Sequence, residues 1–425
     1  MINIINKKDC VGCHACVQRC PKSCISMKED EQGFLYPVVD INLCIDCHIC
    51  EKVCPDINQS ESRNPLLTYA AKNKNLEIKR RSSSGGVFYA LAEAIINDGG
   101  VVFGAKFNEA WDVVHDYAET LEGVIAFQGS KYVQSHIGDS YLQAEKFLKS
   151  GRKVMFTGTP CQIAGLRLFL RKDYDGQLLT VDLVCHGVPS PGVWKKYLKY
   201  ITRPKGALDG KNTVSQSTLN RQMSVITDIS FRDKRLGWEK FGFAVHAVAR
   251  KGDKNSVPQS KNGFSEEQEL LFEPHYENLF MQGFLKDLYL RPSCYDCPTK
   301  SGKSHADITL ADFWGIQKYY PRYYSEGYYS LLLVRTKIGH EILASLNSII
   351  LQETSYEMAL RGNPAIERSS VKPKQYDTFW ELFSETGISA VSTVVTAMRP
   401  TLLMRVYWKS RRIFAQILRK IKILK

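Results

Sequence analysis

Cysteine is the residue type whose spacing in this sequence most strongly indicates chemistry. Nine of the 13 cysteines lie between Cys10 and Cys54. They include two copies of the run C-x2-C-x2-C-x3-C followed by proline, and the second copy begins 34 residues after the first. The runs consist of Cys10, Cys13, Cys16 and Cys20, and then of Cys44, Cys47, Cys50 and Cys54. Such spacing places three thiolates on one tight loop, within reach of three irons of one cubane, and gives the fourth thiolate to the other cluster.

The duplication predicts two 4Fe-4S clusters in one small α+β domain of the two-cluster ferredoxin type. The first, cluster I, is assigned to Cys10, Cys13, Cys16 and Cys54. The second, cluster II, is assigned to Cys44, Cys47, Cys50 and Cys20. Two four-cysteine zinc sites or inert thiols are the alternatives, and two full runs that each end in Cys-Pro favour the clusters. Cys24 lies off the pattern and is predicted to be structural.

The four remaining cysteines, called the third thiol set, are Cys161, Cys185, Cys294 and Cys297. Cys161 and Cys185 follow the apolar segments 154–158 and 178–184, which we expect to be strands. Ligands of open α/β sheets bind at the carboxyl ends of strands, so these thiols are well placed for chemistry. Cys294 and Cys297 form a CxxC, which is typical of zinc, of a redox pair or of half an iron-sulfur site. Four thiols suffice for one cluster, and buried free cysteines remain the alternative.

The elements around these cysteines indicate an α/β body after the N-terminal domain. A polar segment at 56–65 places a boundary near residues 60–66, which leaves 1–60 as the cluster domain. The segments 100–107, 113–118 and 128–134 are expected to be strands, and 87–96 and 140–149 to be helices.

Small residues precede the first of these helices. The sequence Ser-Ser-Ser-Gly-Gly at 82–86 can bind an anion such as a phosphate through free backbone N–H groups, or can serve as a simple helix cap. Lys131 either faces a flavin phosphate or is a solvated surface charge.

Composition and targeting signals set outer bounds. The chain has 425 residues, of which 44% are hydrophobic and 24% charged, as in a globular protein of two or three domains. No apolar run approaches the roughly 18 residues of a membrane-spanning helix, and MINIINKKD at the start lacks the apolar core of a signal peptide. We therefore expect a cytoplasmic protein, in which clustered cysteines bind metal rather than form disulfides.

The net charge of +13 is concentrated at the C-terminus, because residues 399–425 carry nine basic and no acidic side chains. Residues 400–425 are predicted to form a basic amphipathic helix. Such a helix either contacts an anionic membrane surface, which would place the protein peripherally at the inner membrane face, or packs on the body. No nucleic-acid partner is expected, since no recognition motif accompanies this charge.

The order of motifs along the chain resembles one family. After the cysteine runs come SSSGGVFYAL, GSKYVQS, FTGTPCQIAGL, DLVCHGVPSP, SFRDKRLGW, SCYDC and ADITLADFWG. Over about residues 1–340 the chain resembles the beta-subunit family of coenzyme F-420 (deazaflavin) hydrogenases and dehydrogenases, including its members found among bacterial surface-polysaccharide genes. The resemblance implies an FAD-containing oxidoreductase whose flavin lies beside a 4Fe-4S cluster. It also implies that the third thiol set ligates a third cluster, and that Ser84, Gly85, Gly86 and Lys131 contact FAD.

The resemblance divides the body into a flavin-binding part at 66–150 and a part at 151–340 with the third cluster and the active site. The residues beyond it show no family motif, and 341–399 are expected to form a helical region. Electrons from ferredoxin or a reduced (deaza)flavin would pass through the clusters to FAD, which converts single electrons into hydride for an organic substrate, in a surface-polysaccharide pathway. The alternative is an electron-transfer subunit of a hydrogenase or dehydrogenase complex.

Two further sites concern the substrate. His186 follows Cys185 and would protonate the substrate, although a packed or hydrogen-bonding histidine is the alternative. Arg232, Lys234, Arg235 and Trp238 form a basic and aromatic loop that would hold an anionic or sugar-like substrate, the alternative being solvated charges.

Overall fold

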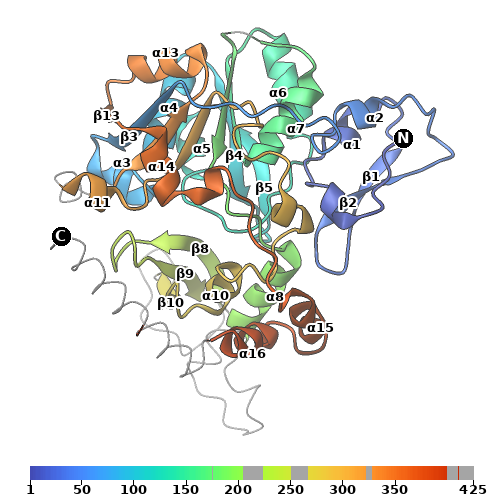
Figure 1. Cartoon of the computed structure of the whole chain (residues 1–425), viewed down its shortest axis with the longest axis vertical. Helices are drawn as coiled ribbons and strands as arrows, with labels where there is room; N and C mark the ends of the chain where they lie inside the picture. Colours follow the sequence, from blue (N-terminus) through green and yellow to red (C-terminus); the bar gives the residue numbers. More distant parts are fainter. Residues whose placement is uncertain (175, 204–223, 250–266, 322–327, 400–409, 411–425) are drawn as a thin grey trace, which may run out of the picture.

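The computed structural model describes residues 1–174, 176–203, 224–249, 267–321, 328–399 and 410. It has three parts (Figure 1): an N-terminal cysteine-rich domain, an α/β body around a large sheet, and a smaller α/β region beneath it. Except for residue 410, the tail predicted at 400–425 lies outside the described residues. Among the described residues, no helix combines the length and apolar character needed to cross a membrane.

The N-terminal domain repeats one local conformation in its two cysteine runs. Its elements are η1 (Lys7–Asp9), α1 (Ala15–Arg19), β1 (Ile25–Glu29), β2 (Leu35–Val39) and α2 (Ile49–Lys52). Strands β1 and β2 pair antiparallel, with Ile25 opposite Val39. Helices α1 and α2 each begin after a left-handed histidine, His14 (φ 62°) and His48 (φ 57°). Both histidines lie between the second and third cysteines of their runs, so the sequence duplication is also a structural one.

The body is built on an eight-stranded sheet in which most neighbours are not consecutive in the chain. In spatial order the strands are β13 (Ile349–Glu353), β3 (Leu67–Asn73), β12 (Ser330–Val334), β11 (Ile308–Asp312), β7 (Leu178–Leu183), β6 (Val154–Gly158), β4 (Val101–Phe107) and β5 (Val113–Ala118). Strands β11, β7, β6 and β4 are mutually parallel, and β3 runs in the same direction because β12 is antiparallel to both β3 and β11. These five strands therefore end at one edge of the sheet.

Helices cover both faces of this sheet because its strands are apolar on both sides. In β12, Leu332 and Val334 face a core that includes α4, α5 and α13, whereas Leu331 and Leu333 face a core that includes α11 and α14. Helices α6 and α7 pack over β4 and β6. The helical elements of the body are α3 (Leu76–Arg81), α4 (Val87–Asn97), α5 (Leu121–Ile125), α6 (Ser140–Lys149), α7 (Pro160–Leu170), η2 (Pro292–Asp296), α11 (Ile316–Tyr319), α13 (Lys337–Ser345), α14 (Tyr356–Gly362) and η3 (Pro364–Ile366).

The smaller region has a largely aromatic core. Its three-stranded antiparallel sheet has the order β10-β9-β8. Phe231 of β8 and Phe243 of β9 pack with Trp194 of α8 and Phe280 of α10. Its elements are α8 (Pro191–Ile201), β8 (Ser224–Asp233), β9 (Gly242–Ala249), β10 (Gln268–Pro274), α10 (Leu279–Phe284), α15 (Tyr376–Thr386) and α16 (Ser389–Ala397).

The N-terminal domain is docked on the body. Val11, Cys13 and Val53 belong to the same apolar core as Ile163 and Leu166 of α7. An ion pair of 3.0 Å between Arg19 and Glu145 adds a polar contact. The segment 56–65, predicted as a linker, is tied to the body, since the Arg63 N–H donates to the Ser301 carbonyl over 3.1 Å.

Most of the predicted elements are confirmed, and two expectations are corrected. Segment 128–134 is not a strand: Gly129 has a φ of 80°, and the Ser130 N–H donates to a side chain, the Ser83 hydroxyl, rather than to a strand. Region 341–399 is not wholly helical, because Ile349–Glu353 forms β13 and pairs with β3 in the large sheet. The large sheet also joins β4 and β5 to β6 and β7, so residues 66–150 and 151–340 build one body.

Candidate functional site

The four thiols assigned to cluster I lie close enough in the N-terminal domain to influence one another electrostatically. Cys10, Cys13 and Cys16 are buried and Cys54 is partly buried. Burial, followed by the neighbouring Cys16, Cys54 and Cys10 thiols, raises the pKa of Cys13 well above its usual value. Burial and then Cys10 and Cys54 likewise raise the pKa of Cys16. Cys54 thus acts on the same thiols with which the crossed pattern groups it, and the ligand set of cluster I stays a prediction.

The thiols assigned to cluster II line one small cavity, which is bounded by Cys20, Cys44, Cys47 and Cys50 together with Cys24. Backbone N–H groups point at two of these sulfurs: Ile2 donates to Cys50 Sγ over 3.2 Å and Asp46 to Cys44 Sγ over 3.4 Å. Cys24 Sγ lies 3.3 Å from Cys20 Sγ. The sequence did not place Cys24 in this cavity, because it lies outside the repeated spacing.

The third thiol set comes together at the carboxyl edge of the large sheet. Cys161 lies in the first turn of α7, after β6, and Cys185 follows the neighbouring strand β7. Cys294 lies within η2, and Cys297 is the first residue after the end of η2. Burial and then the thiols of Cys297 and Cys185 raise the pKa of Cys161 to about 12. Burial and then Cys185, Cys297 and Cys161 raise that of Cys294.

Buried positive charges flank the third thiol set. Lys300 Nζ donates to the carbonyls of Cys185 and Ala365, and its charge opposes the increase that burial causes in the pKa of Cys185. Arg291 acts on Cys161 in the same sense. No ion pair among the described residues joins either cation to a carboxylate. Four thiolates carry negative charge, so the surroundings fit a cluster at this position.

Within the described chain, no three His, Cys, Asp or Glu side chains are arranged to hold a single metal ion.

The two motifs predicted to contact FAD also meet. The Ser83 hydroxyl oxygen accepts hydrogen bonds from the N–H (2.7 Å) and the hydroxyl (2.8 Å) of Ser130, next to Lys131. Ser84 and Gly85, however, bond to strand β12 and the residue before it: the Ser84 hydroxyl donates to the Tyr329 carbonyl, and the Gly85 N–H donates to Ser330 Oγ. Gly86 has a φ of 81° and precedes α4 without a side-chain cap.

Lysines from three segments gather around the turn at 82–86. Lys234 Nζ donates to the carbonyls of Ser82 and Lys79, and Lys131 Nζ donates to the carbonyl of Gln128. Burial, followed by the charges of Arg232 and Lys79, lowers the pKa of Lys234 to about 7. Burial lowers that of Lys131 to about 8. Several enclosed cations beside a helix N-terminus fit the phosphates of a dinucleotide cofactor.

The structure divides the loop predicted to hold the substrate. Lys234 belongs to the lysine group just described, whereas Arg232 pairs with Asp312 over 2.8 Å. Trp238 donates to the same carboxylate over 3.2 Å and stacks on Trp314 at 4.7 Å between ring centroids. Arg232 and Trp238 thus both contact Asp312, the last residue of β11. This strand ends at the same sheet edge as the third thiol set.

Arg235 and His186 have partners of their own. Arg235 forms ion pairs with Asp233 and Glu269 at the surface. His186 Nε2 lies 2.6 Å from Asp287 Oδ1, and 44% of the histidine side chain is exposed.

Comparison with known proteins agrees with this arrangement. Residues 151–357 match a family model that describes the C-terminal part of the coenzyme F420 hydrogenase/dehydrogenase beta subunit. Residues 9–56 match a 4Fe-4S dicluster domain. Residues 151–357 therefore belong to the coenzyme F420 hydrogenase/dehydrogenase beta-subunit family. The resemblance found in the motifs is confirmed, as are the dicluster domain and a place among iron-sulfur oxidoreductases. All four cysteines of the third thiol set lie within the beta-subunit match, and the turn at 82–86 lies before it.

A solved structure shares similarity over most of the chain. It belongs to the F420-reducing [NiFe] hydrogenase complex from Methanosarcina barkeri, studied by xenon derivatization. The two chains are 18% identical with a TM-score of 0.42, and the match covers 79% of this chain and 93% of the other. No curated protein sequence matches.

Proposed function

We propose that this chain is the electron-transfer subunit of an oxidoreductase complex, in which clusters I and II exchange electrons with a third 4Fe-4S cluster on Cys161, Cys185, Cys294 and Cys297. The observation that carries this proposal is the docking of Cys13 on α7. Cys13 lies against Gly165, which follows Cys161 by four residues, or about 6 Å of helix rise. Helix α7 thus carries Cys161, a proposed ligand of the third cluster, and contacts Cys13, a proposed ligand of cluster I.

FAD is the proposed acceptor at the other end of this path. Bound flavin would supply the conversion between single electrons and a hydride pair. Lys131 and Lys234 would hold its phosphates, and Gly86 would allow their close approach to the first turn of α4. Support comes from Lys131 and Lys234 near residues 82–86. Burial lowers the pKa of both lysines, and the charges of Arg232 and Lys79 lower that of Lys234 further, so a bound anion would stabilise their charged forms.

A subunit role is favoured over a free-standing reductase of a surface-polysaccharide pathway. The family model that matches describes a beta subunit. His186, the residue predicted to protonate an organic substrate, is half exposed and already paired with Asp287. The proposed subunit would exchange electrons with a redox partner. Ferredoxin and a reduced (deaza)flavin are the proposed classes of partner.

The full chain, purified anaerobically, tests this function. Iron and flavin are quantified first, and reduction of the bound flavin by reduced ferredoxin is then followed in a stopped-flow instrument. The proposal expects flavin reduction that becomes at least tenfold slower when Cys294 and Cys297 are replaced by serine, and no steady turnover of small organic molecules by the chain alone. Absence of flavin, or sustained turnover of an organic substrate by the isolated chain, would overturn it.

A further inference from the structure

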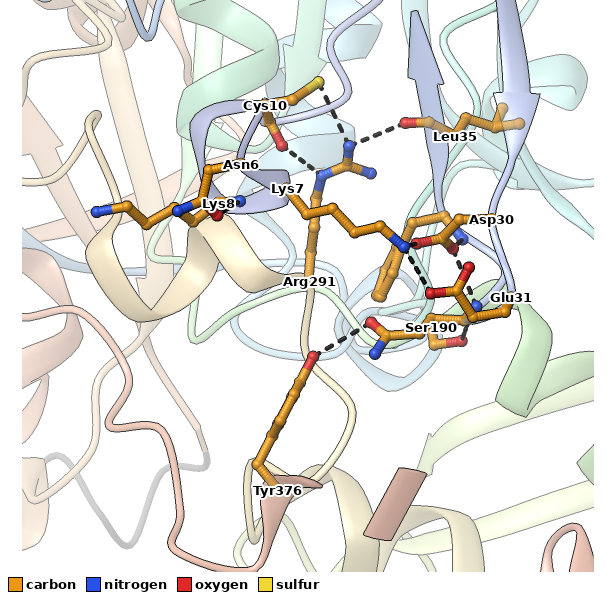
Figure 2. A network of polar contacts seen from close by, with 12 residues as sticks. Asn6, Lys7, Lys8, Cys10, Asp30, Glu31, Leu35, Ser190, Arg291 and Tyr376 are labelled. Carbon is orange, nitrogen blue, oxygen red and sulfur yellow. Dashed lines mark hydrogen bonds and ion pairs between the residues drawn. The ribbon is translucent and has the colours of Figure 1, made fainter. Parts of the chain in front are cut away.

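Arg291 is a buried cation at the junction of the N-terminal domain and the body. Its residue is 1% exposed. The guanidinium donates to the Cys10 carbonyl from Nε (2.7 Å) and to the Leu35 carbonyl from Nη2 (2.9 Å), as Figure 2 shows. Nη1 donates to Gln134 Oε1 over 3.0 Å. One side chain from the body is therefore fixed by two segments of the N-terminal domain and by a third contact in the body.

The same residue connects two thiol sets. Its Nη2 lies 3.5 Å from Cys10 Sγ, within hydrogen-bonding distance for sulfur. Its carbonyl accepts the Cys294 N–H over 2.8 Å, at the start of the CxxC. The side chain of Arg291 thus reaches a ligand of cluster I, while its backbone holds the loop that carries half of the third thiol set.

The charge of Arg291 has aromatic and carbonyl neighbours in place of a carboxylate. The guanidinium carbon lies 4.4 Å from the ring centroid of Tyr36 and 5.4 Å from that of Phe34. Among the ion pairs of the described residues, none includes Arg291. A buried cation is costly unless an opposite charge compensates it. The Cys10 sulfur, as a thiolate of cluster I, is the anionic group that the geometry provides.

We propose that Arg291 is a positioning residue that acts through Cys10 to stabilise the reduced form of cluster I and so sets its reduction potential. Reduction adds one electron, which leaves the cluster one charge more negative, and no bond is made or broken. A fixed positive charge beside a ligand sulfur favours that form, and more strongly in a buried site than in water. The inference rests on the dicluster domain, and it rests on the third cluster of the proposed function only for the electron's destination.

The test is an anaerobic potentiometric titration of the full chain, reduced by dithionite with mediators and monitored by electron paramagnetic resonance. In Arg291→Gln, one step should move to a more negative potential by at least a tenfold change in the one-electron equilibrium, or 59 mV. Arg291→Lys retains the charge but loses the planar fork, so its step should move much less. Lys195→Gln is the matched control, because it removes a positive charge of the smaller region that pairs with Glu29 of the N-terminal domain in solvent, and it should shift no step.

A second variant keeps the test decisive if Arg291→Gln fails to fold or to hold iron. Gln134→Glu leaves the guanidinium in place and sets a carboxylate against Nη1, which should also make cluster I harder to reduce. Unchanged potentials in a cluster-loaded Arg291→Gln or Gln134→Glu protein would overturn the inference, as would equal shifts in Arg291→Gln and Arg291→Lys. The iron content of the Cys294 and Cys297 double variant tests the third cluster separately, so the two failures are distinguishable.

Discussion

Gly165 of α7 lies against Cys13 so closely that a Cβ on residue 165 would stand 2.9 Å from the Cys13 Sγ and Cβ atoms. Glycine is needed here for close approach, since only a residue without Cβ lets the helix contact the cluster I loop. Tyr141 closes the contact from α6, because its hydroxyl oxygen would lie 3.1 Å from the same Cβ. The same contact therefore docks the N-terminal domain and fixes the position of Cys13, a predicted cluster ligand.

Gly165→Ala should displace Cys13 and impair cluster I. Overpacking a tight contact costs typically about 1–3 kcal/mol, and here the neighbour that must move is a predicted cluster ligand. We expect the iron content of anaerobically purified protein to fall from about twelve towards about eight per chain, at four irons per cubane. Iron analysis with electron paramagnetic resonance measures this change. Full iron content with unchanged spectra would show that the helix can shift away from Cys13.

Replacing Cys294 and Cys297 together by serine should remove the third cluster and leave the N-terminal pair. The expected iron content is about eight per chain in place of about twelve, because each cubane contributes four. Cys24→Ser is the matched control: Cys24 lies in the cluster II cavity but outside the repeated spacing, so its loss should leave iron unchanged. Unchanged iron in the double variant would contradict a cluster on the third thiol set.

The sequence predicted the dicluster domain because cluster ligation imposes a spacing that is local in the chain. Cys10, Cys13 and Cys16 lie on one loop, and the partner Cys54 follows from the duplication alone. The proximity of Cys161 and Cys185 was also foreseeable, since both follow parallel strands, and β6 and β7 are neighbours in the sheet.

Contacts that depend on tertiary packing left no such trace. Arg291 precedes a proline and resembles any surface arginine in the sequence, yet it is buried by segments 281 and 256 residues away. Lys234 was assigned to a substrate loop, because nothing local indicates that it reaches Ser82, which is 152 residues away. Segment 128–134 has the composition of a strand, but the Ser130 N–H donates to the Ser83 hydroxyl and the Gln134 N–H to the Pro189 carbonyl.

Lys234→Met and Lys131→Met should each weaken FAD retention while the iron content stays intact. Each change removes one positive charge beside the turn at 82–86, and we expect at least a tenfold loss of FAD affinity per variant. Arg235→Met is the matched control, because Arg235 lies next to Lys234 but pairs with Asp233 and Glu269. Flavin absorbance after gel filtration provides the measurement. These variants are cleaner than Gly86→Asp, since any side chain at a φ of 81° is strained.

Full flavin occupancy in both lysine variants would place the phosphates elsewhere. Equal loss in Arg235→Met would instead indicate general electrostatic attraction by this surface rather than contact by particular lysines.

FAD affinity should fall as the pH rises from about 7 to 9. In the flavin-free protein, burial and neighbouring charges lower the pKa of Lys234 to about 7 and burial lowers that of Lys131 to about 8. Below pH 7 both ammonium groups are already charged, so affinity should be nearly independent of pH. Above these values a lysine must take up a proton when the phosphates bind, since the anion raises its pKa again. Each required proton then reduces affinity by up to tenfold per pH unit.

Fluorescence titration of flavin-free protein between pH 6 and 9 measures this slope, and Lys234→Met should flatten it between pH 7 and 8. A slope that is the same in Lys234→Met as in the unmodified protein would show that another group controls binding.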